Sequence, residues 1–161
     1  MRKKHIIINM VDYILEKIVP TFMIILLLIM IILTASDIMA RSFFSTSLAA
    51  ARALTKFLFI WIIFLGISYG VRKEEHFKMT ELLDKLPEKV QKTIKILIIV
   101  LSITFFAVLF LISTFKHMPM AWQRVEIATG VEARYFYLSI PIGSLLAIIA
   151  LIRNFIDMIN K

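Results

Sequence analysis

Long apolar stretches dominate the chain, and short polar or charged segments separate them. A helix that crosses the ~30 Å hydrocarbon layer of a membrane needs about 17 to 25 predominantly apolar residues. Stretches of this kind lie at about 21–40, 54–71, 94–115 and 135–156. The pattern therefore predicts an all-α membrane protein with four transmembrane helices, and we expect residues 1–161 to form a single membrane domain.

The polar segments between these spans differ in character. Residues 42–53 and 116–134 contain small and polar residues and are predicted to be loops. Residues 75–86 instead place apolar side chains at helical spacing within a charged segment, and Pro87 follows. We expect an amphipathic helix on the membrane surface here, with Pro87 in the first turn of the next helix.

Lys and Arg are distributed unequally between the two ends of the predicted spans. The ends that carry the termini and residues 75–86 hold Arg2, Lys3, Lys4, Lys17, Arg72, Lys73, Lys78, Lys85, Lys89, Lys92, Lys95, Arg153 and Lys161. The opposite ends hold Arg41, Arg52, Lys56, Lys116, Arg124 and Arg134. Because basic residues concentrate on the cytoplasmic side of membrane proteins, both termini and the amphipathic segment are predicted to be cytoplasmic.

The composition supports a membrane location. Sixty per cent of the residues are hydrophobic and the mean hydropathy is +0.89, and a soluble domain of this size lacks the polar surface to cover so many apolar residues. The net charge of +8 comes from basic residues beside the apolar stretches, which argues against a nucleic-acid partner. The absence of cysteine excludes disulfides and thiolate metal sites.

No predicted span carries an ionisable residue at its centre, where coupled transporters place their functional acids. Asp37 lies near the end of the first span, and its i, i+4 spacing to Arg41 favours an ion pair at the interface over an ion ligand. The histidines His5, His76 and His117 lie beside the predicted membrane boundaries. We therefore expect no catalytic, substrate-binding, metal or cofactor site in this chain, which indicates an accessory or scaffolding subunit rather than an enzyme.

Several motifs occur in an order that resembles a known family. The second span contains Trp61, Phe64, Leu65 and Gly66; Arg72 and His76 follow, then Leu86 and Pro87, and a second motif runs from Tyr137 to Gly143. Together with four spans, this order resembles the small membrane (Q) subunit of the tripartite ATP-independent periplasmic (TRAP) transporters.

The resemblance implies a function and a set of partners. In such a system a periplasmic binding protein delivers an organic acid, and a large membrane (M) subunit of the bacterial inner membrane carries it inward with sodium ions. The Q subunit holds no substrate and widens the static scaffold beside the large subunit. A dicarboxylate, a sialic acid or another sugar acid are all open as substrates.

Roles for individual residues follow from this resemblance and from residue type. Small or shape-determining residues are expected to pack helices or contact the partner: Trp61, Gly66, Ser68, Gly70, Pro141, Gly143 and Ala147. Arg72, Lys73 and His76 are expected beside anionic phospholipid headgroups at the cytoplasmic exit. Arg52, Lys116, Arg124 and Glu126 are candidates for contact with the binding protein.

Two other functions remain open on the sequence. A stand-alone small multidrug exporter would transport without partners, but the first span here lacks the deep acid that such an exporter needs. A membrane anchor subunit of an enzyme, for example a haem-binding one, would need histidines at mid-span, and no predicted span has one.

Overall fold

The computed structural model describes residues 10–73 and 87–159. The predicted amphipathic helix at 75–86, including His76, lies outside these residues. The described elements are η1 (Ile14–Ile18), α2 (Val19–Phe44), α3 (Ala49–Lys73), α5 (Glu88–Ile112), η2 (Ser113–His117), α6 (Met118–Ala121), α7 (Ala133–Tyr137) and α8 (Ser139–Ile159).

Four continuous helical stretches are long and apolar enough to cross a membrane: Met10–Phe44, Ala49–Lys73, Val90–Ala121 and Ala133–Met158. The described residues contain no strand, and their single β-bridge joins Val125 to Glu132. For the described residues, the prediction of an all-helical fold with four helices long and apolar enough to span a membrane is thus confirmed.

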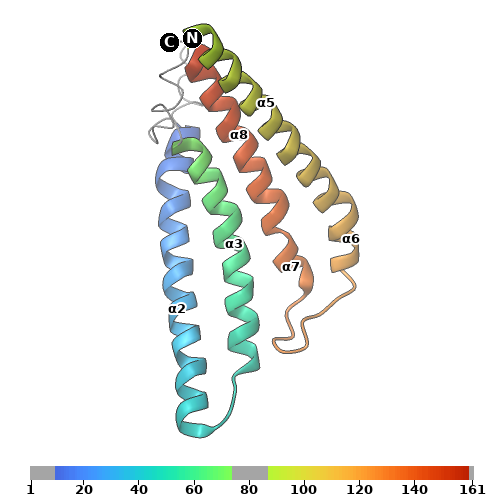
Figure 1. Cartoon of the computed structure of the whole chain (residues 1–161). Helices are drawn as coiled ribbons and strands as arrows, with labels where there is room; N and C mark the ends of the chain where they lie inside the picture. Colours follow the sequence, from blue (N-terminus) through green and yellow to red (C-terminus); the bar gives the residue numbers. More distant parts are fainter. Residues whose placement is uncertain (1–9, 74–86, 160–161) are drawn as a thin grey trace.

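The four long helices form a row rather than a closed bundle (Figure 1). Their main contacts run from α2 to α3, from α3 to α8 and from α8 to α5. One buried cluster lies between α2 and α3, and a second joins α5 to α8: Val19, Leu26, Leu58 and Leu65 in the first, and Phe106, Ala147 and Leu151 in the second. The spatial order therefore differs from the order along the chain, because the last helix lies inside the row.

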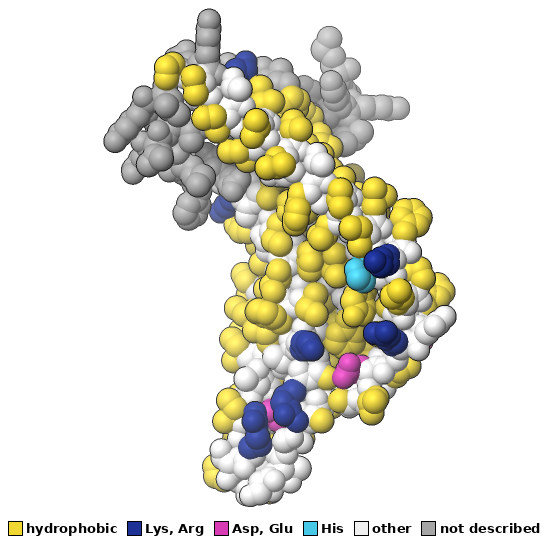
Figure 2. Space-filling view, turned by 45° about the vertical axis from the view of Figure 1, so that its right-hand side comes forward, with side chains coloured by type: hydrophobic (Ala, Val, Ile, Leu, Met, Phe, Trp, Pro, Cys, Tyr) yellow, Lys and Arg dark blue, Asp and Glu magenta, His cyan; other side chains and the backbone are white. Residues whose placement is uncertain are grey.

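A row of this kind leaves broad apolar surfaces uncovered. Large apolar side chains are exposed along both edge helices: Phe22, Ile25, Ile29 and Ile32 on α2, and Leu97, Leu101, Phe105 and Val108 on α5. Figure 2 shows apolar side chains over most of the visible face. Lipid tails or another membrane protein are the surroundings in which such a surface is stable.

Two π-helical turns interrupt the long helices, each just before a proline. The Val19 N–H donates to the Ile14 carbonyl immediately before Pro20, and the Met118 N–H donates to the Ser113 carbonyl before Pro119. A proline cannot donate to the carbonyl four residues earlier and clashes with it, and a widened turn relieves that clash. The helices continue through both prolines for this reason.

The predicted loops are longer than those observed. Helix α2 continues to Phe44 and α3 begins at Ala49, so the connection predicted over 42–53 is only 45–48. The helix-forming run Ala49–Ala51 begins the next helix early. The second predicted loop, 116–134, shortens to 122–132 because η2 and α6 extend the third helix.

The fourth span is divided into two helices. Helix α7 ends at Tyr137 and α8 starts at Ser139. Pro141 lacks the N–H that would bond to the Tyr137 carbonyl, which accounts for the break at Leu138.

Candidate functional site

Helices α3 and α8 approach each other closely at Gly143. A Cβ atom built on this glycine would lie 2.5 Å from Phe64 Cβ and 2.9 Å from the Phe64 carbonyl oxygen. Because part of this obstruction is backbone, α8 would have to move away from α3 to accommodate any side chain. Gly143 thus packs α8 directly on α3, as expected of a small residue between membrane helices.

The other small residues predicted at helix contacts differ in how closely they are packed. Ser68 and Ala147 are fully buried, and the Ser68 hydroxyl donates to its own helix at the Leu65 carbonyl, 2.7 Å away. Within the described part of the chain, a Cβ on Gly66 would meet only the terminal methyl of Met23, at 3.2 Å. A Cβ on Gly70 would have no heavy atom within 4 Å among the described residues, so the predicted close packing at Gly70 stays a prediction.

Trp61 and Pro141 connect α3 with the fourth helical stretch. The Trp61 indole N–H donates to the Tyr135 carbonyl at 3.2 Å. This bond satisfies a carbonyl in the short helix α7, just before the break that Pro141 causes. Pro141 itself is buried. The two residues therefore fix how the chain enters α8.

Charged side chains from three helical segments meet at one end of the row. The Arg72 guanidinium lies 3.2 Å from Asp12, 3.3 Å from Glu16 and 3.1 Å from Asp157, and it donates to Asn154 Oδ1 at 2.9 Å. Only 9% of the Arg72 side chain is exposed. Three carboxylates surround the guanidinium, so Arg72 is bound by its own chain, and its predicted place beside lipid headgroups stays a prediction.

Two further residues of α8 complete this group. Arg153 pairs with Asp12 at 3.1 Å and with Asp157, and the Asn154 amide donates to the Val71 carbonyl at 2.7 Å. We call Asp12, Glu16, Arg72, Arg153, Asn154 and Asp157 the charge network. Its Arg153–Asp157 pair has the i, i+4 spacing that a sequence shows, but the partners of Arg72 lie more than 50 residues away and sequence inspection missed them.

Lys73, predicted beside headgroups, is exposed and lies over the Tyr69 ring at 5.3 Å. Its predicted contact with lipid stays a prediction.

The opposite end of the row is organised by Asp37, which is almost fully buried. Its carboxylate accepts a hydrogen bond from the Leu48 N–H at 2.8 Å and pairs with Arg41. The predicted Asp37–Arg41 pair is confirmed. The bond to Leu48 adds a function that the sequence did not suggest, because it caps the start of α3 and closes the α2–α3 connection.

The residues predicted to contact the binding protein all lie on or beside the connections at this second end. Arg52 donates to the Ser47 hydroxyl at 2.8 Å, and Lys116 is exposed on η2. Arg124 and Glu126 line a hollow of about 570 Å³ together with Lys56. Figure 2 shows Lys and Arg side chains gathered toward the end where the α2–α3 connection lies.

The buried serine hydroxyls between the two ends donate to carbonyls of their own helical stretch. Ser139 donates to the Phe136 carbonyl at 2.8 Å and Ser144 to the Ile140 carbonyl at 2.7 Å, both within their own helical stretch. Hydroxyls bonded in this way do not form a polar site between helices. The described residues place their charged groups at the two ends of the row, and no group of three or more metal-ligating side chains occurs among them.

Comparison with known proteins shows the family to which this sequence belongs. Residues 30–161 match the family described as the DctQ component of the tripartite ATP-independent periplasmic transporters. The chain belongs to the DctQ family. The resemblance to the small TRAP subunit is therefore confirmed. Because the DctQ protein is one component of a tripartite transporter, neither the stand-alone exporter nor the enzyme anchor fits this family.

Two relatives from Haemophilus influenzae carry names from the same transporter class. The sialic acid TRAP transporter permease protein SiaT of strain 86-028NP is 27% identical over 113 residues, which cover 69% of this chain and 18% of that protein. A protein of strain Rd, named as a TRAP transporter small permease, is 30% identical over 70 residues, 44% of each chain. This DctQ family member thus spans less than half of the length of these curated relatives.

Proposed function

We propose that this DctQ component is the static membrane scaffold of a TRAP transporter. It packs beside a large TRAP membrane subunit and widens the surface against which the mobile part of that subunit moves. The large subunit drives uptake with sodium ions, and a periplasmic binding protein supplies the substrate. The chain itself holds neither the substrate nor the sodium ions.

The observation that carries this proposal is the open row of helices. Both edge helices, α2 and α5, expose long apolar faces, whereas the charged residues gather at the two ends. A wide, flat and apolar row of helices with polar contacts at its ends fits a static scaffold. A transport pathway would need polar groups within the membrane.

The cellular arrangement belongs to the same proposal. We place the charge network and both termini on the cytoplasmic side of the bacterial inner membrane, in accordance with the excess of Lys and Arg there. The substrate is an organic acid: a dicarboxylate, a sialic acid or another sugar acid. A relative named for sialic acid supports the inclusion of that class.

The outer end contributes to docking of the binding protein through Arg52, Lys116, Arg124 and Glu126. Charge reversal of Arg52 and Arg124 together is expected to raise the concentration of binding protein that gives half-maximal uptake. An unchanged half-saturating concentration contradicts a role for these two charges. The exposed position of both side chains supports the proposal.

The scaffold proposal is tested by purifying the tagged chain in mild detergent together with the proteins encoded beside it. We expect a stoichiometric complex with a larger polytopic membrane protein. In proteoliposomes that complex should take up an organic acid only with sodium and an added binding protein. A chain that purifies alone and transports a substrate by itself contradicts the proposal.

A further inference from the structure

The connection between α6 and α7 exposes several large apolar side chains. Ile127 is 99% exposed, and Trp122 and Val125 are exposed as well. We call residues 122–132, which contain all three, the α6–α7 connection. Single exposed apolar residues are common on proteins, but apolar residues grouped on one short segment mark a contact with a protein or a membrane.

Backbone hydrogen bonds give the α6–α7 connection a defined shape. The Glu126 N–H donates to the Val131 carbonyl at 2.9 Å, and the Ala133 N–H donates to the Arg124 carbonyl at 2.9 Å. The Gly130 N–H donates to the Glu126 carbonyl at 2.8 Å, and Gly130 has a φ of 68°, which glycine adopts without strain. These bonds form a hairpin whose turn follows Glu126.

This hairpin lies beside α3 at the outer boundary of the membrane. Val125 and Glu126 line the same hollow as Ala53 and Lys56 of α3. Ala53 and Lys56 precede Arg72 by 19 and 16 residues, or about 24 to 29 Å along a helix. With Arg72 and the rest of the charge network at the cytoplasmic boundary, a hydrocarbon layer of about 30 Å ends at the level of the hairpin.

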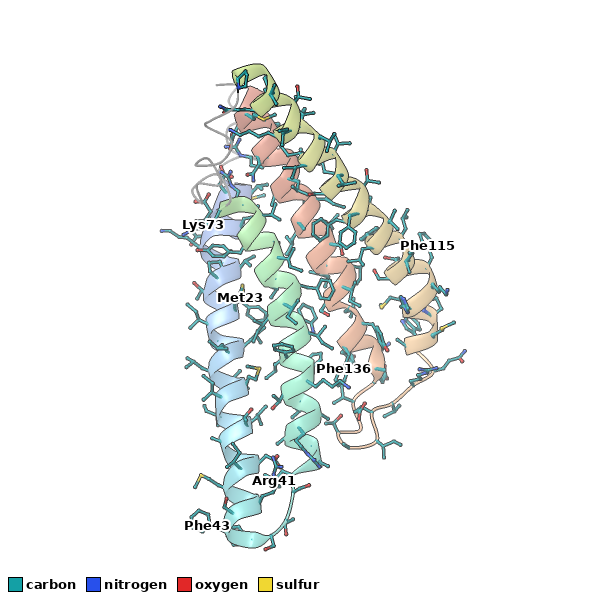
Figure 3. All side chains as sticks on the ribbon, in the orientation of Figure 1. Met23, Arg41, Phe43, Lys73, Phe115 and Phe136 are labelled. Carbon is teal, nitrogen blue, oxygen red and sulfur yellow. The ribbon has the colours of Figure 1, made fainter. Side chains whose placement is uncertain are left out.

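The other connection at this end of the row projects farther. Figure 1 shows the α6–α7 connection beside α3, short of the end where α2 joins α3. Phe43, which Figure 3 shows at the far end of the α2–α3 pair, lies six residues beyond Asp37, or about 9 Å farther along α2. The two connections therefore lie at different depths, and the α6–α7 connection is the one at the level of the lipid headgroups.

The aromatic residues at this level are of the kinds that membrane interfaces favour. The Arg134 guanidinium lies over the Trp122 ring at 5.5 Å and over the Tyr135 ring at 5.0 Å, and both rings are exposed. Trp and Tyr are enriched at the headgroup level, where the ring meets apolar groups and its N–H or O–H meets polar ones. Phe136 instead packs against Phe57 of α3, with ring centroids 4.7 Å apart (Figure 3), which fixes α7 on α3.

We infer that the α6–α7 connection is an interfacial anchor that inserts Ile127 and Trp122 into the headgroup layer of the outer lipid leaflet. This inference rests on the proposed function only for the orientation of the chain. Ala128 and Thr129 follow Ile127, so the turn carries one large apolar side chain and suits shallow insertion. The anchor holds the outer ends of the third and fourth spans at a fixed depth, as a static scaffold requires.

The test uses the absence of cysteine from this chain, which allows a single label to be placed at Ile127. Ile127→Cys carries the environment-sensitive fluorophore NBD, in a complex with a cysteine-free large subunit in liposomes that contain acyl-brominated phospholipid. The matched control is the same label on Phe43→Cys, because Phe43 is 76% exposed but lies on the farther connection. We expect brominated lipid to quench the Ile127 label, and added iodide to quench the Phe43 label instead. A saturating amount of binding protein should leave the lipid quenching at Ile127 unchanged.

Other results overturn the inference. A label at Ile127 that iodide quenches and brominated lipid does not shows that the hairpin lies in water. Short-wavelength emission that neither quencher reduces shows that a protein covers Ile127 instead. Equal quenching of both labels by brominated lipid contradicts the difference in depth between the two connections.

A second variant tests the role of Trp122. Adding Trp122→Ser to the labelled Ile127→Cys chain removes one of the two inserted side chains, so quenching by brominated lipid should decrease. The control Phe115→Ser removes an exposed aromatic side chain from η2 and should leave the quenching as it was. Unchanged quenching in the Trp122 variant overturns the assignment of Trp122 to the anchor.

The experiment also separates the two proposals. If the wild-type chain does not co-purify with a large subunit, or if uptake needs no binding protein, the proposed function fails, and the label is then read on the full chain in the same liposomes. If the complex transports as proposed but brominated lipid does not quench the Ile127 label, only the anchor inference fails.

Discussion

The two ends of the row of helices are built in opposite ways. At one end, the charge network binds the start of the first helical stretch, the end of α3 and the end of α8 to one another. At the other end, Asp37 closes a single connection between α2 and α3, while Phe43 and Phe44 remain exposed. The charge network at the first end pairs its charged groups within the chain, and the second end presents aromatic side chains to its surroundings. The difference shows where the chain is held together by its own ion pairs and where it leaves aromatic side chains uncovered.

The largest effect is expected from Gly143→Leu. This substitution should push α8 away from α3 and so loosen the row of helices between its two ends. The new side chain overlaps the Phe64 backbone, so we expect a loss of stability of about 3 kcal/mol or more. Thermal unfolding in detergent measures it. The matched control is Gly70→Leu, where a Cβ meets no heavy atom of residues 10–73 and 87–159 within 4 Å. Equal melting of the Gly143 variant and wild type contradicts the contact.

Arg72→Met removes the centre of the charge network and should selectively weaken the braced end. Asp12, Glu16 and Asp157 then face one another without their shared cation. A buried ion pair that loses one partner costs about 3–5 kcal/mol, and we expect roughly 2 kcal/mol here because the carboxylates are partly exposed. Thermal unfolding is compared with that of Lys92→Met, a change at an exposed lysine of α5.

A double variant tests whether repulsion between the carboxylates causes the loss of stability in Arg72→Met. Adding Glu16→Gln to Arg72→Met removes one of the repelling carboxylates without touching the pairs of Arg153, so the double variant should melt above Arg72→Met alone. Additive losses indicate that the two side chains are not coupled.

Asp37→Ala tests the second end and should have a smaller effect. It removes the acceptor for the Leu48 N–H and the partner of Arg41. These two contacts of Asp37 together stabilise the α2–α3 connection by about 1–2 kcal/mol. Limited proteolysis between Ser45 and Leu48 should become faster. Asp37→Asn retains an oxygen for the Leu48 N–H and should be cleaved more slowly than Asp37→Ala; equal cleavage of both variants argues against the cap.

The smallest effect is expected for Gly66→Ala. Among the described residues, its Cβ would meet only the terminal methyl of Met23, at 3.2 Å, and a methionine end adjusts easily. We expect a loss below about 1 kcal/mol in thermal unfolding. A larger loss indicates that α2 and α3 are held more rigidly than this contact suggests.

Local patterns predict the parts of the structure that depend on neighbouring residues. Apolar stretches identify the four helices, and i, i+4 spacing identifies the Asp37–Arg41 pair. Polarity alone overestimates the loop lengths, because helix continuation through Ser42, and through Pro119 after a π-turn, depends on contacts and turn geometry.

Contacts between distant segments are not available from the sequence. Gly143 is a candidate for close packing, but nothing in the sequence marks Phe64 as the residue opposite it. The three carboxylates that bind Arg72 come from the first and last helical stretches. The sequence does not show that these stretches meet α3, and for this reason it suggests only lipid beside Arg72. The lateral order of helices sets these partnerships, and periodicity along a single helix carries no information about that order.

The order of the row also has a consequence for biogenesis. Helix α5 is synthesised before α8, yet its main contact is with α8, the last helix to leave the ribosome. During insertion, α2 and α3 can pair at once, whereas α5 must remain in lipid without its neighbour until α8 enters between it and α3. A nascent chain that stops before Ser139 can therefore assemble its first helix pair, but α5 then lacks its main contact among the described helices.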